Sequence, residues 1–289
     1  MILVLPLGPE DAPTELPRVT SALIALNIAV FLLVNGPADR VLERKTAELE
    51  RLAQWEVEKE RAARPGALPA RDRYPTALAY LSLDPAWRET VSREARDRLD
   101  GYVEEYDGLR ASHPFYRYGF VPSQPSALRL VTHQFLHGDL LHILFNMIFL
   151  WSAGSYLESV WGAPLFALSY LGSGCAAAIV HALCNRGSVE TAIGASGAIA
   201  GLMGAILASN PAARMKVAFV YALSLAPRIR FFAAPTGVLV GLWLLQQVFM
   251  TLMTVRIAMP VAFAAHLGGF GAGVLASVIR RLVAGPAGG

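Results

Sequence analysis

Residues 140–157 read LLHILFNMIFLWSAGSYL, a stretch of 18 residues without aspartate, glutamate, lysine or arginine. A helix needs about 20 mostly apolar residues to cross the hydrocarbon core of a bilayer. Five further stretches lack these charged residues over a comparable length, and they lie at residues 19–38, 159–185, 191–213, 231–255 and 257–279. We therefore predict an all-α polytopic membrane protein in which six transmembrane helices form one bundle.

The composition favours a membrane protein over a nucleic-acid-binding protein. Of the 289 residues, 54% are hydrophobic and 16% are charged, whereas about 25% of the residues in a soluble domain are charged. The pI is near 9.0, but the basic residues of the second half stand singly or in pairs between apolar stretches. That pattern is typical of membrane flanks rather than of a nucleic-acid-binding groove. Cys175 and Cys184 share one apolar stretch and are interpreted as free thiols.

Basic residues in short loops predict the orientation of the spans, because such loops favour the cytoplasm. Most of them would lie on the side of the N-terminus: Arg18, Arg214, Lys216, Arg228, Arg230, Arg280 and Arg281. We therefore predict that both termini are cytoplasmic, and we expect the inner membrane of a bacterium. No basic segment precedes the first span, so residues 19–38 are expected to remain as an anchor rather than to act as a cleaved signal peptide.

Five parts follow along the chain. We predict a short cytoplasmic N-terminus (1–18), a first transmembrane helix (19–38), an extracytoplasmic insert (39–130), a core with five further spans (131–283) and a cytoplasmic tail (284–289). The insert contains 16 acidic and 16 basic residues, so its charges balance. It is therefore not a polybasic lipid anchor.

Two helices are predicted in the insert, and they are expected to form an antiparallel hairpin. The first covers residues 40–63, and its thin apolar stripe consists of Leu42, Leu49 and Leu52. The second would begin with Asp84 as its cap and Pro85 at the first helical position. Its apolar residues recur at three- and four-residue spacing: Trp87, Val91, Ala95, Leu99, Tyr102, Tyr106 and Leu109.

The first segment with polar side chains inside a span is residues 132–146, THQFLHGDLLHILFN. His142 and Asn146 are four residues apart, so they share one helix face. A zinc site is an alternative, because His133, His137 and His142 lie close in the chain. Zinc sites of the HExxH type place a glutamate between two histidines, and no glutamate stands here. The histidine and asparagine pair is better suited to donate hydrogen bonds to an oxyanion, and we expect no metal and no cofactor.

The second segment is residues 194–201, GASGAIAG, at the start of an apolar stretch. One interpretation is purely structural, because small residues let transmembrane helices pack closely. The functional interpretation is that Ser196 lies at a helix N-terminus, beside free backbone N–H groups and the positive end of the helix dipole. The amide of Ser196 could then help to hold an oxyanion.

The third segment is residues 265–273, AHLGGFGAG. Gly269 and Gly273 follow His266 by three and seven residues, so all three share one helix face. That face permits close approach to another face of small residues, such as Gly197 and Gly201. Packing the two faces together would bring His266 against Ser196, and a serine needs such an adjacent base to become a nucleophile.

These three segments, in this order and each in its own span, resemble the rhomboid family of intramembrane serine proteases. The resemblance implies a bundle of six helices, with a GxSG serine opening the fourth helix and a histidine on the sixth as its base. It also implies an HxxxN pair on the second helix that supports the oxyanion. These positions correspond to Ser196, His266, His142 and Asn146, with Gly194 as the first glycine of the GxSG motif.

Several further residues match or depart from the family pattern. His137 matches a family histidine at the outer end of the second helix, and Glu158 matches a glutamate at its inner end that is interpreted as structural. The fifth-helix region of bacterial members is similar to the residues Gly241, Leu242, Trp243 and Gln247. Some members place a tyrosine under the histidine, four residues after the nucleophile, and here that position is Ala200.

The resemblance implies an endopeptidase whose substrates are transmembrane proteins, cut near the outer face of the membrane. A rival from another class is a rhomboid-like protein without catalytic activity that binds membrane clients; such a protein would lack the serine or the histidine. A transporter is a second rival, but the sequence shows no internal repeat and almost no acidic residues within the spans.

Overall fold

The computed structural model describes residues 2–10, 16–65, 77–78, 81, 85–188, 190–221, 228–254 and 263–284. The chain divides into two compact units. One unit, here called the core unit, combines Met1–Leu33 with Tyr118–Gly289. The other, the hairpin unit, is Val34–Arg117.

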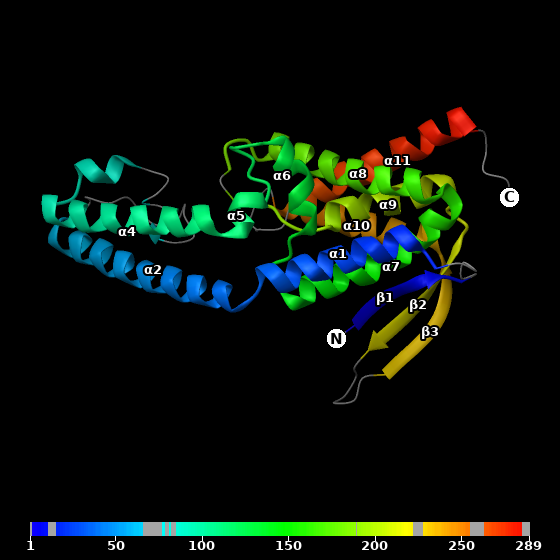
Figure 1. The fold of residues 1–289 in the computed structure, drawn as a ribbon, viewed down its shortest axis with the longest axis horizontal. Coiled ribbons are helices and arrows are strands. Elements are labelled where there is room, and N and C mark those ends of the chain that lie inside the picture. Colours follow the sequence, from blue (N-terminus) through cyan, green and yellow to red (C-terminus); the bar gives the residue numbers. More distant parts are fainter. Residues whose placement is uncertain are drawn as a thin grey trace. The chain divides into compact units, whose positions relative to one another are not determined.

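The core unit is built around six helices, and each overlaps one predicted span (Figure 1). They are α1 (Arg18–Val34), α7 (Leu140–Trp161), α8 (Ala163–Cys184), α9 (Ser196–Ser209), α10 (Thr236–Thr254) and α11 (Phe263–Ala284). Among the described residues, three helices are long and apolar enough to cross a membrane: Leu140–Trp161, Ala163–Cys184 and Phe263–Val283. The mostly helical fold is thereby confirmed, with three helices as candidate membrane spans, and the count of six spans stays a prediction.

Two short helices and a 3-10 turn precede the second long helix of the core unit. They are α5 (Pro114–Tyr118), α6 (Ala127–Thr132) and η3 (His133–Phe135). Asp139 then caps α7, because its carboxylate accepts a hydrogen bond from the backbone N–H of His142 at 2.8 Å. This cap sets where α7 begins.

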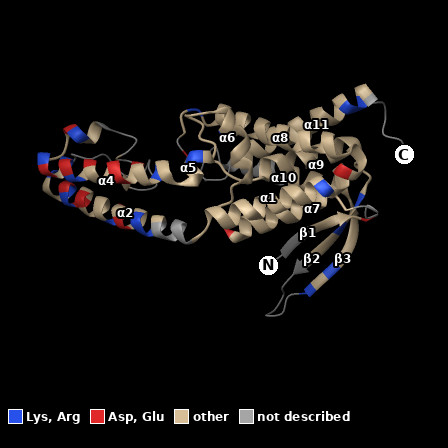
Figure 2. Ribbon diagram, viewed as in Figure 1, with Lys and Arg blue, Asp and Glu red and all other residues tan. Residues whose placement is uncertain are grey.

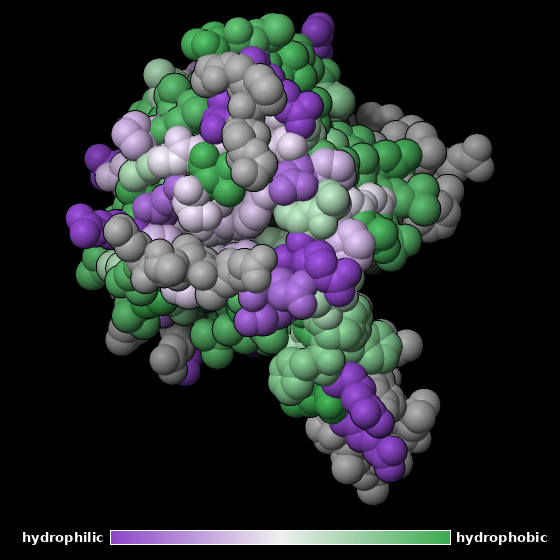
Figure 3. All heavy atoms as spheres, turned by 90° about the vertical axis from the view of Figure 1, so that its right-hand side faces the viewer, coloured by the Kyte–Doolittle hydropathy of each residue, from purple (hydrophilic) through white to green (hydrophobic). Residues whose placement is uncertain are grey.

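The surface of the core unit agrees with a lipid environment. Charged residues are sparse on its helices, whereas they gather densely on α2 and α4 of the hairpin unit (Figure 2). In the face shown in Figure 3, hydrophilic residues gather near the centre and hydrophobic residues flank them. Helix ends that border water, with helix sides that border lipid, would give this distribution.

A three-stranded antiparallel sheet corrects the all-α prediction. Strands β1 (Ile2–Pro9), β2 (Arg214–Tyr221) and β3 (Arg228–Pro235) pair in the order β1-β2-β3 (Figure 1). Residues 231–235 were predicted to open the helix of the span 231–255, but they belong to strand β3. The alternation of charged and apolar residues from 214 to 217, RMKV, is the period of a strand.

Helix α9 occupies the centre of the bundle. All ten residues from Gly197 to Ile206 are buried, which agrees with a helix that is apolar on every side. The predicted span 191–213 is longer than this helix, because residues 191–195 form an irregular segment and Arg214 already belongs to β2.

Glu158 is structural, as interpreted from the sequence. Its carboxylate accepts hydrogen bonds from the backbone N–H groups of Val19 and Thr20 at 2.9 and 2.8 Å, and from the Thr20 hydroxyl at 2.7 Å. These N–H groups lie in the first turn of α1 and have no partner within their own helix. An acidic residue of α7 thus caps the N-terminus of α1.

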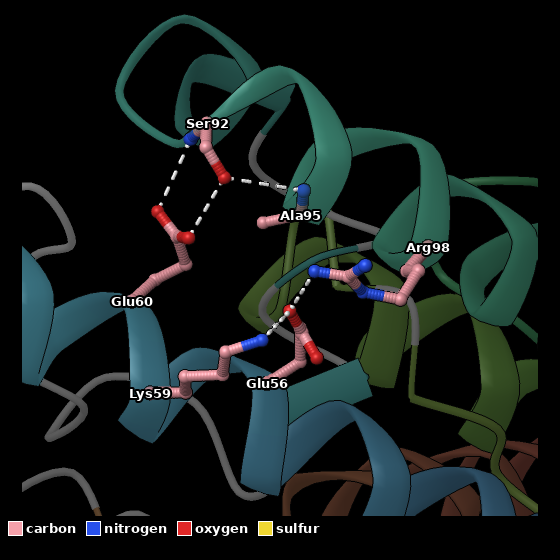
Figure 4. A network of polar contacts seen from close by, with 6 residues as sticks. All are labelled: Glu56, Lys59, Glu60, Ser92, Ala95 and Arg98. Atoms are coloured by element: carbon pink, nitrogen blue, oxygen red, sulfur yellow. Dashed lines mark hydrogen bonds and ion pairs between the residues drawn. The ribbon is translucent and has the colours of Figure 1, made fainter.

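The hairpin unit pairs α2 (Pro37–Ala63) with α4 (Arg93–Ser112) in antiparallel fashion, as predicted. Glu60 near the end of α2 accepts hydrogen bonds from the Ser92 backbone N–H and hydroxyl, at 3.1 and 2.8 Å (Figure 4). Four residues earlier, the buried Glu56 accepts a hydrogen bond from Arg98 at 2.6 Å. This pair of carboxylates is here called the carboxylate clasp.

The details of the second hairpin helix differ from the prediction. Residues Pro85–Glu89 form the 3-10 helix η2, and α4 begins only after Ser92, whose hydroxyl accepts from the Ala95 N–H at 3.2 Å. The expected cap Asp84 lies outside the described residues. The predicted stripe of α2 was also partly wrong, since Leu52 is 40% exposed. The buried apolar residues of the two helices and of the segment between them are instead Leu49, Ala53, Val57, Ala77, Leu78, Leu81, Trp87, Val91, Ala95, Leu99, Val103 and Tyr106.

Candidate active site

Ser196 and His266 meet inside the core unit. Ser196 is the first residue of α9, and His266 lies in the first turn of α11. The Nε2 atom of His266 is 2.8 Å from the Oγ atom of Ser196, across 70 residues of sequence. At this distance the imidazole can accept the hydroxyl proton, which is the geometry that an activated serine requires.

The two glycine faces explain why these side chains meet. A methyl group placed on Gly269 would overlap the carbonyl oxygen of Gly197, and one placed on Gly273 would overlap that of Gly201. The backbones of α9 and α11 therefore touch, as the spacing of these glycines predicts. This contact brings the first turns of both helices together, and Ser196 and His266 lie in those turns.

His142 and Asn146 approach the same place from α7. Gly194 has a φ of 119°, a backbone conformation that residues with a side chain rarely adopt. A Cβ atom there would lie 2.7 Å from His142 Nε2 and 3.7 Å from Asn146 Nδ2. The loop before the serine thus passes directly over both side chains, and only a glycine fits.

The amide nitrogen of Asn146 is an unused donor. Its Nδ2 atom is buried and has no hydrogen-bond partner among the described residues. Leaving a buried donor unpaired costs about 1–3 kcal/mol, so such groups call for an explanation. An oxyanion that forms only during a reaction would supply the missing acceptor.

His137 contacts His142 and so helps to hold the His142 ring in place. Its ring meets that of His142 edge to face, with centroids 5.0 Å apart. Burial, and secondly the charge of His142, lowers the pKa of His137 to about 4. Burial likewise lowers the pKa of His133 to about 4, and the Nδ1 atom of His133 lies 2.8 Å from the Arg129 carbonyl oxygen. Both rings are therefore neutral at physiological pH.

The described residues contain no group of three histidine, cysteine, aspartate or glutamate side chains that could hold a metal ion. His133, His137 and His142, the three histidines considered for zinc from the sequence, do not form such a group. Instead, the rings of His137 and His142 meet edge to face.

Two aromatic residues flank His266, and neither had a role predicted from the sequence. The Trp243 ring of α10 lies 6.1 Å from the imidazole at a tilt of 41°, and the Phe263 ring lies 6.2 Å away, edge to face. Ala200, at the position of the stacking tyrosine, is fully buried in the core. Trp243 could be found from the sequence only through its likeness to the fifth-helix region. The side chain of Gln247 lies outside the described residues.

Comparison with known proteins matches the rhomboid domain to residues 124–282. The chain belongs to the rhomboid family. The matched range contains all the site residues named above, so the predicted resemblance is confirmed at the level of the family.

Three relatives show the extent of the similarity. The chain is 35% identical to RHOMBOID-like protein 6, mitochondrial, of Arabidopsis thaliana over 127 residues, 39% of this chain and 41% of that protein. It is 39% identical to Rhomboid protease GluP of Bacillus subtilis over 79 residues, 27% and 15% of the two chains. It is 32% identical to the presenilin-associated rhomboid-like protein, mitochondrial, of Bos taurus over 88 residues, 30% and 23%.

The chain thus spans less than half the length of the curated relatives it matches. These relatives include plant proteins, proteins named mitochondrial and a bacterial protein. A membrane location follows from the family, and the bacterial inner membrane and the cytoplasmic termini stay predictions.

Proposed function

We propose that this rhomboid-family protein is an intramembrane serine endopeptidase that cleaves transmembrane proteins. The observation that carries the proposal is the 2.8 Å distance between Ser196 Oγ and His266 Nε2 on two helices in backbone contact. A name supports it as well, since one relative is called a rhomboid protease.

The chemistry is acyl transfer. Nε2 of His266 takes the Ser196 proton as the serine oxygen attacks a peptide carbonyl carbon, forming a tetrahedral intermediate with a negatively charged oxygen. The imidazolium then gives that proton to the leaving amine, and the C–N bond breaks. A water molecule, deprotonated by the same imidazole, hydrolyses the resulting ester and frees Ser196.

Three groups would hold the negatively charged oxygen: the Ser196 backbone N–H, His142 and Asn146. The N–H of Ser196 is free because the first N–H groups of a helix have no partner within it. Asn146 Nδ2 is buried and unpaired beside Gly194. Donors of this kind contribute about 3–4 kcal/mol each to lowering the barrier.

The substrate would be a transmembrane segment that can unwind near the outer face of the membrane. Attack requires an extended backbone, and unwound backbone inside a bilayer must find hydrogen-bond partners in the protein or water. We expect small or helix-breaking residues at the cleavage site for this reason. The predicted topology places Ser196, at the N-terminal end of α9, towards the outer side.

A rhomboid-like protein that binds membrane clients without cleaving them is the second hypothesis. Several relatives carry the name RHOMBOID-like, which states no activity. Covalent labelling by a fluorophosphonate separates the two hypotheses, because only an activated serine reacts with it.

The dyad predicts the outcome of three substitutions. Ser196→Ala and His266→Ala should each abolish labelling and cleavage of a reporter transmembrane substrate, and the double variant should be no worse than either single one. The matched control is Ser209→Ala on the same helix, whose hydroxyl lies 2.9 Å from that of Ser277. That variant should label normally, and substantial cleavage by Ser196→Ala would contradict the proposal.

A further inference from the structure

The sheet of the core unit has one face on the helices and one face turned away from them. Pro6, Met215 and Val217 line a cavity of about 450 Å³ together with residues of α7, α9 and α10. Side chains alternate between the two faces of a strand. Leu5, Ala218 and Phe231, which pair side by side across the three strands, therefore point the other way.

The outward face carries large apolar side chains. Phe231 is 72% exposed and Ile229 is 54% exposed, and Leu7 at the irregularity of β1 is 42% exposed. In Figure 3 the sheet forms the projection at the bottom, where hydrophobic surface adjoins a hydrophilic stripe. Ala218 between Leu5 and Phe231 is buried, so the exposed apolar side chains of this face are concentrated on β3. Large exposed apolar side chains that lie close together often mark a contact with another molecule or a membrane.

Basic side chains lie on both faces of the sheet near these residues: Lys216 shares the outward face with Phe231, whereas Arg228 and Arg230 alternate with Ile229 and Phe231 along β3 and point to the opposite face. Lys216, Arg228 and Arg230 are exposed, and none of them forms an ion pair with an acidic residue in the part of the chain that the structure describes. Arg214 differs, since its Nε atom lies 2.7 Å from a carboxylate oxygen of Glu10. Lys216 thus shares the apolar face, and Arg228 and Arg230 are the chain neighbours of Ile229 and Phe231 that point away from that face.

Exposed aromatic residues next to unpaired cations are typical of protein surfaces that lie at the boundary between lipid headgroups and acyl chains. Pairing of β3 with another strand is disfavoured by the arginines at its outer end and by Pro235 at its inner end. Anionic phosphate groups are the complement to three cations, and a bilayer supplies them beside an apolar layer.

We propose that β2 and β3 form a membrane-interface contact in which Phe231 and Ile229 enter the acyl boundary and Lys216, Arg228 and Arg230 bind anionic phospholipid headgroups. The proposal is independent of the protease activity. It agrees with the predicted topology, which places these residues in the cytoplasm, where the leaflet is rich in anionic lipids.

The depth of Phe231 tests the apolar half of the proposal. A nitroxide is attached to Phe231→Cys in a chain carrying Cys175→Ser and Cys184→Ser, and the protein is placed in vesicles of phosphatidylcholine mixed with phosphatidylglycerol. Labels at Ser123→Cys, in an exposed turn, and at Leu275→Cys, on the exposed side of α11, are the water and hydrocarbon references. We expect oxygen to relax the Phe231 label more than a water-soluble nickel complex does. Equal accessibility at Phe231 and Ser123 would overturn the proposal.

The cations are tested by binding of labelled phosphatidylglycerol to the detergent-solubilised protein. One cation near an anionic surface contributes about fivefold to affinity, so replacing Lys216, Arg228 and Arg230 by glutamine should weaken binding about 100-fold. The matched control replaces Arg44, Arg51 and Arg93, three exposed arginines of the hairpin unit, and should leave binding unchanged. Equal binding by both triple variants would refute the headgroup contact. Protection of Phe231 that rises with protein concentration would instead indicate pairing with a second copy and would also refute it.

Discussion

Helices α9 and α11 of the core unit and helices α2 and α4 of the hairpin unit are both packed pairs, but different contacts hold them. Glycines let the backbones of α9 and α11 touch. The hairpin pair is held by a cluster of buried apolar side chains, which includes Trp87 and Leu99, and by the carboxylate clasp. Helices in lipid lack a hydrophobic driving force and depend on close packing, whereas the hairpin has the apolar core and charged surface of a water-soluble pair.

The largest expected effect comes from filling the glycine contact. Gly273→Ala would drive a methyl group into the carbonyl oxygen of Gly201, and backbone cannot yield as a side chain can. Alanine normally stabilises a helix by about 1 kcal/mol relative to glycine. A loss of stability in Gly273→Ala would therefore reveal the contact between the two backbones. We expect loss of fluorophosphonate labelling at Ser196 and a lower yield of monodisperse protein.

A neighbouring glycine on the same helix provides the control. Gly271→Ala meets nothing within 4 Å and should label and purify like the parent protein. If Gly273→Ala behaves like Gly271→Ala, the close approach of α9 and α11 is not required for the dyad.

The two regions also differ in the hydrogen bonding of buried polar side chains, and Asn146 tests that difference. Each carboxylate of the hairpin clasp accepts at least one hydrogen bond, from Ser92 or from Arg98, whereas the Nδ2 donor of Asn146 has no partner among the described residues. Asn146→Ala should lower the cleavage rate by about 10²-fold without abolishing it, because the other oxyanion donors remain. Single-turnover cleavage of a reporter substrate measures this.

Stability separates this role from a structural one. If Asn146 acts on the oxyanion, the thermal midpoint of Asn146→Ala should stay near that of the parent protein, because no hydrogen bond is lost. A fall in the midpoint that accounts for the lost rate would contradict the assignment.

A smaller effect is expected from acid on Glu60 of the carboxylate clasp. Burial alone would raise the pKa of Glu60, but the hydrogen bonds from Ser92 and the charges of Arg64 and Lys59 together lower it below 4.5. A carboxylate with a lowered pKa stabilises the folded state above its ordinary pKa, and the stabilisation is lost as pH falls through the folded pKa. The protection factors of the α2 and α4 amides against hydrogen exchange, which correct for the intrinsic pH dependence of exchange, should therefore fall below pH 4.5.

Ser92→Ala should remove most of this pH dependence and cost about 1 kcal/mol at neutral pH, because it also removes the cap of α4. Ser112→Ala at the other end of the same helix, where the hydroxyl bonds to the Leu109 carbonyl oxygen, is the control. If the pH dependence of the protection factors is unchanged in Ser92→Ala, the hydrogen bonds from Ser92 to Glu60 are not its cause.

The sequence predicted the bundle and the candidate dyad because their signals are local. The glycine spacing around Gly197 and Gly269 and the charge-free stretches are legible within single helices. The sheet was missed because β1 pairs with a strand more than 200 residues away, and no local pattern specifies that pairing. The contacts of Trp243 and Phe263 with His266 were not predicted for a related reason, since they depend on how α10 and α11 pack.

The smallest expected effect on chemistry comes from removing the hairpin unit altogether. Replacing residues 35–116 by a flexible linker, tested at several lengths, should leave Ser196 reactive toward a small fluorophosphonate. The reason is that Ser196, His266, His142, Asn146 and their contacts all belong to the core unit, whereas the hairpin has its own buried cluster around Trp87. A unit with its own core can be removed without exposing the core of the other unit.

Cleavage of a transmembrane protein substrate should fall more than labelling does, because the predicted topology puts the hairpin on the face where such a substrate enters. The comparison requires a variant that is monodisperse in detergent, and the same deletion carrying Ser196→Ala gives the unlabelled baseline. If labelling disappears in monodisperse protein, the hairpin is part of the active site after all. If labelling and cleavage both persist unchanged, the hairpin has no part in handling substrates, and its charged clasp serves only its own fold.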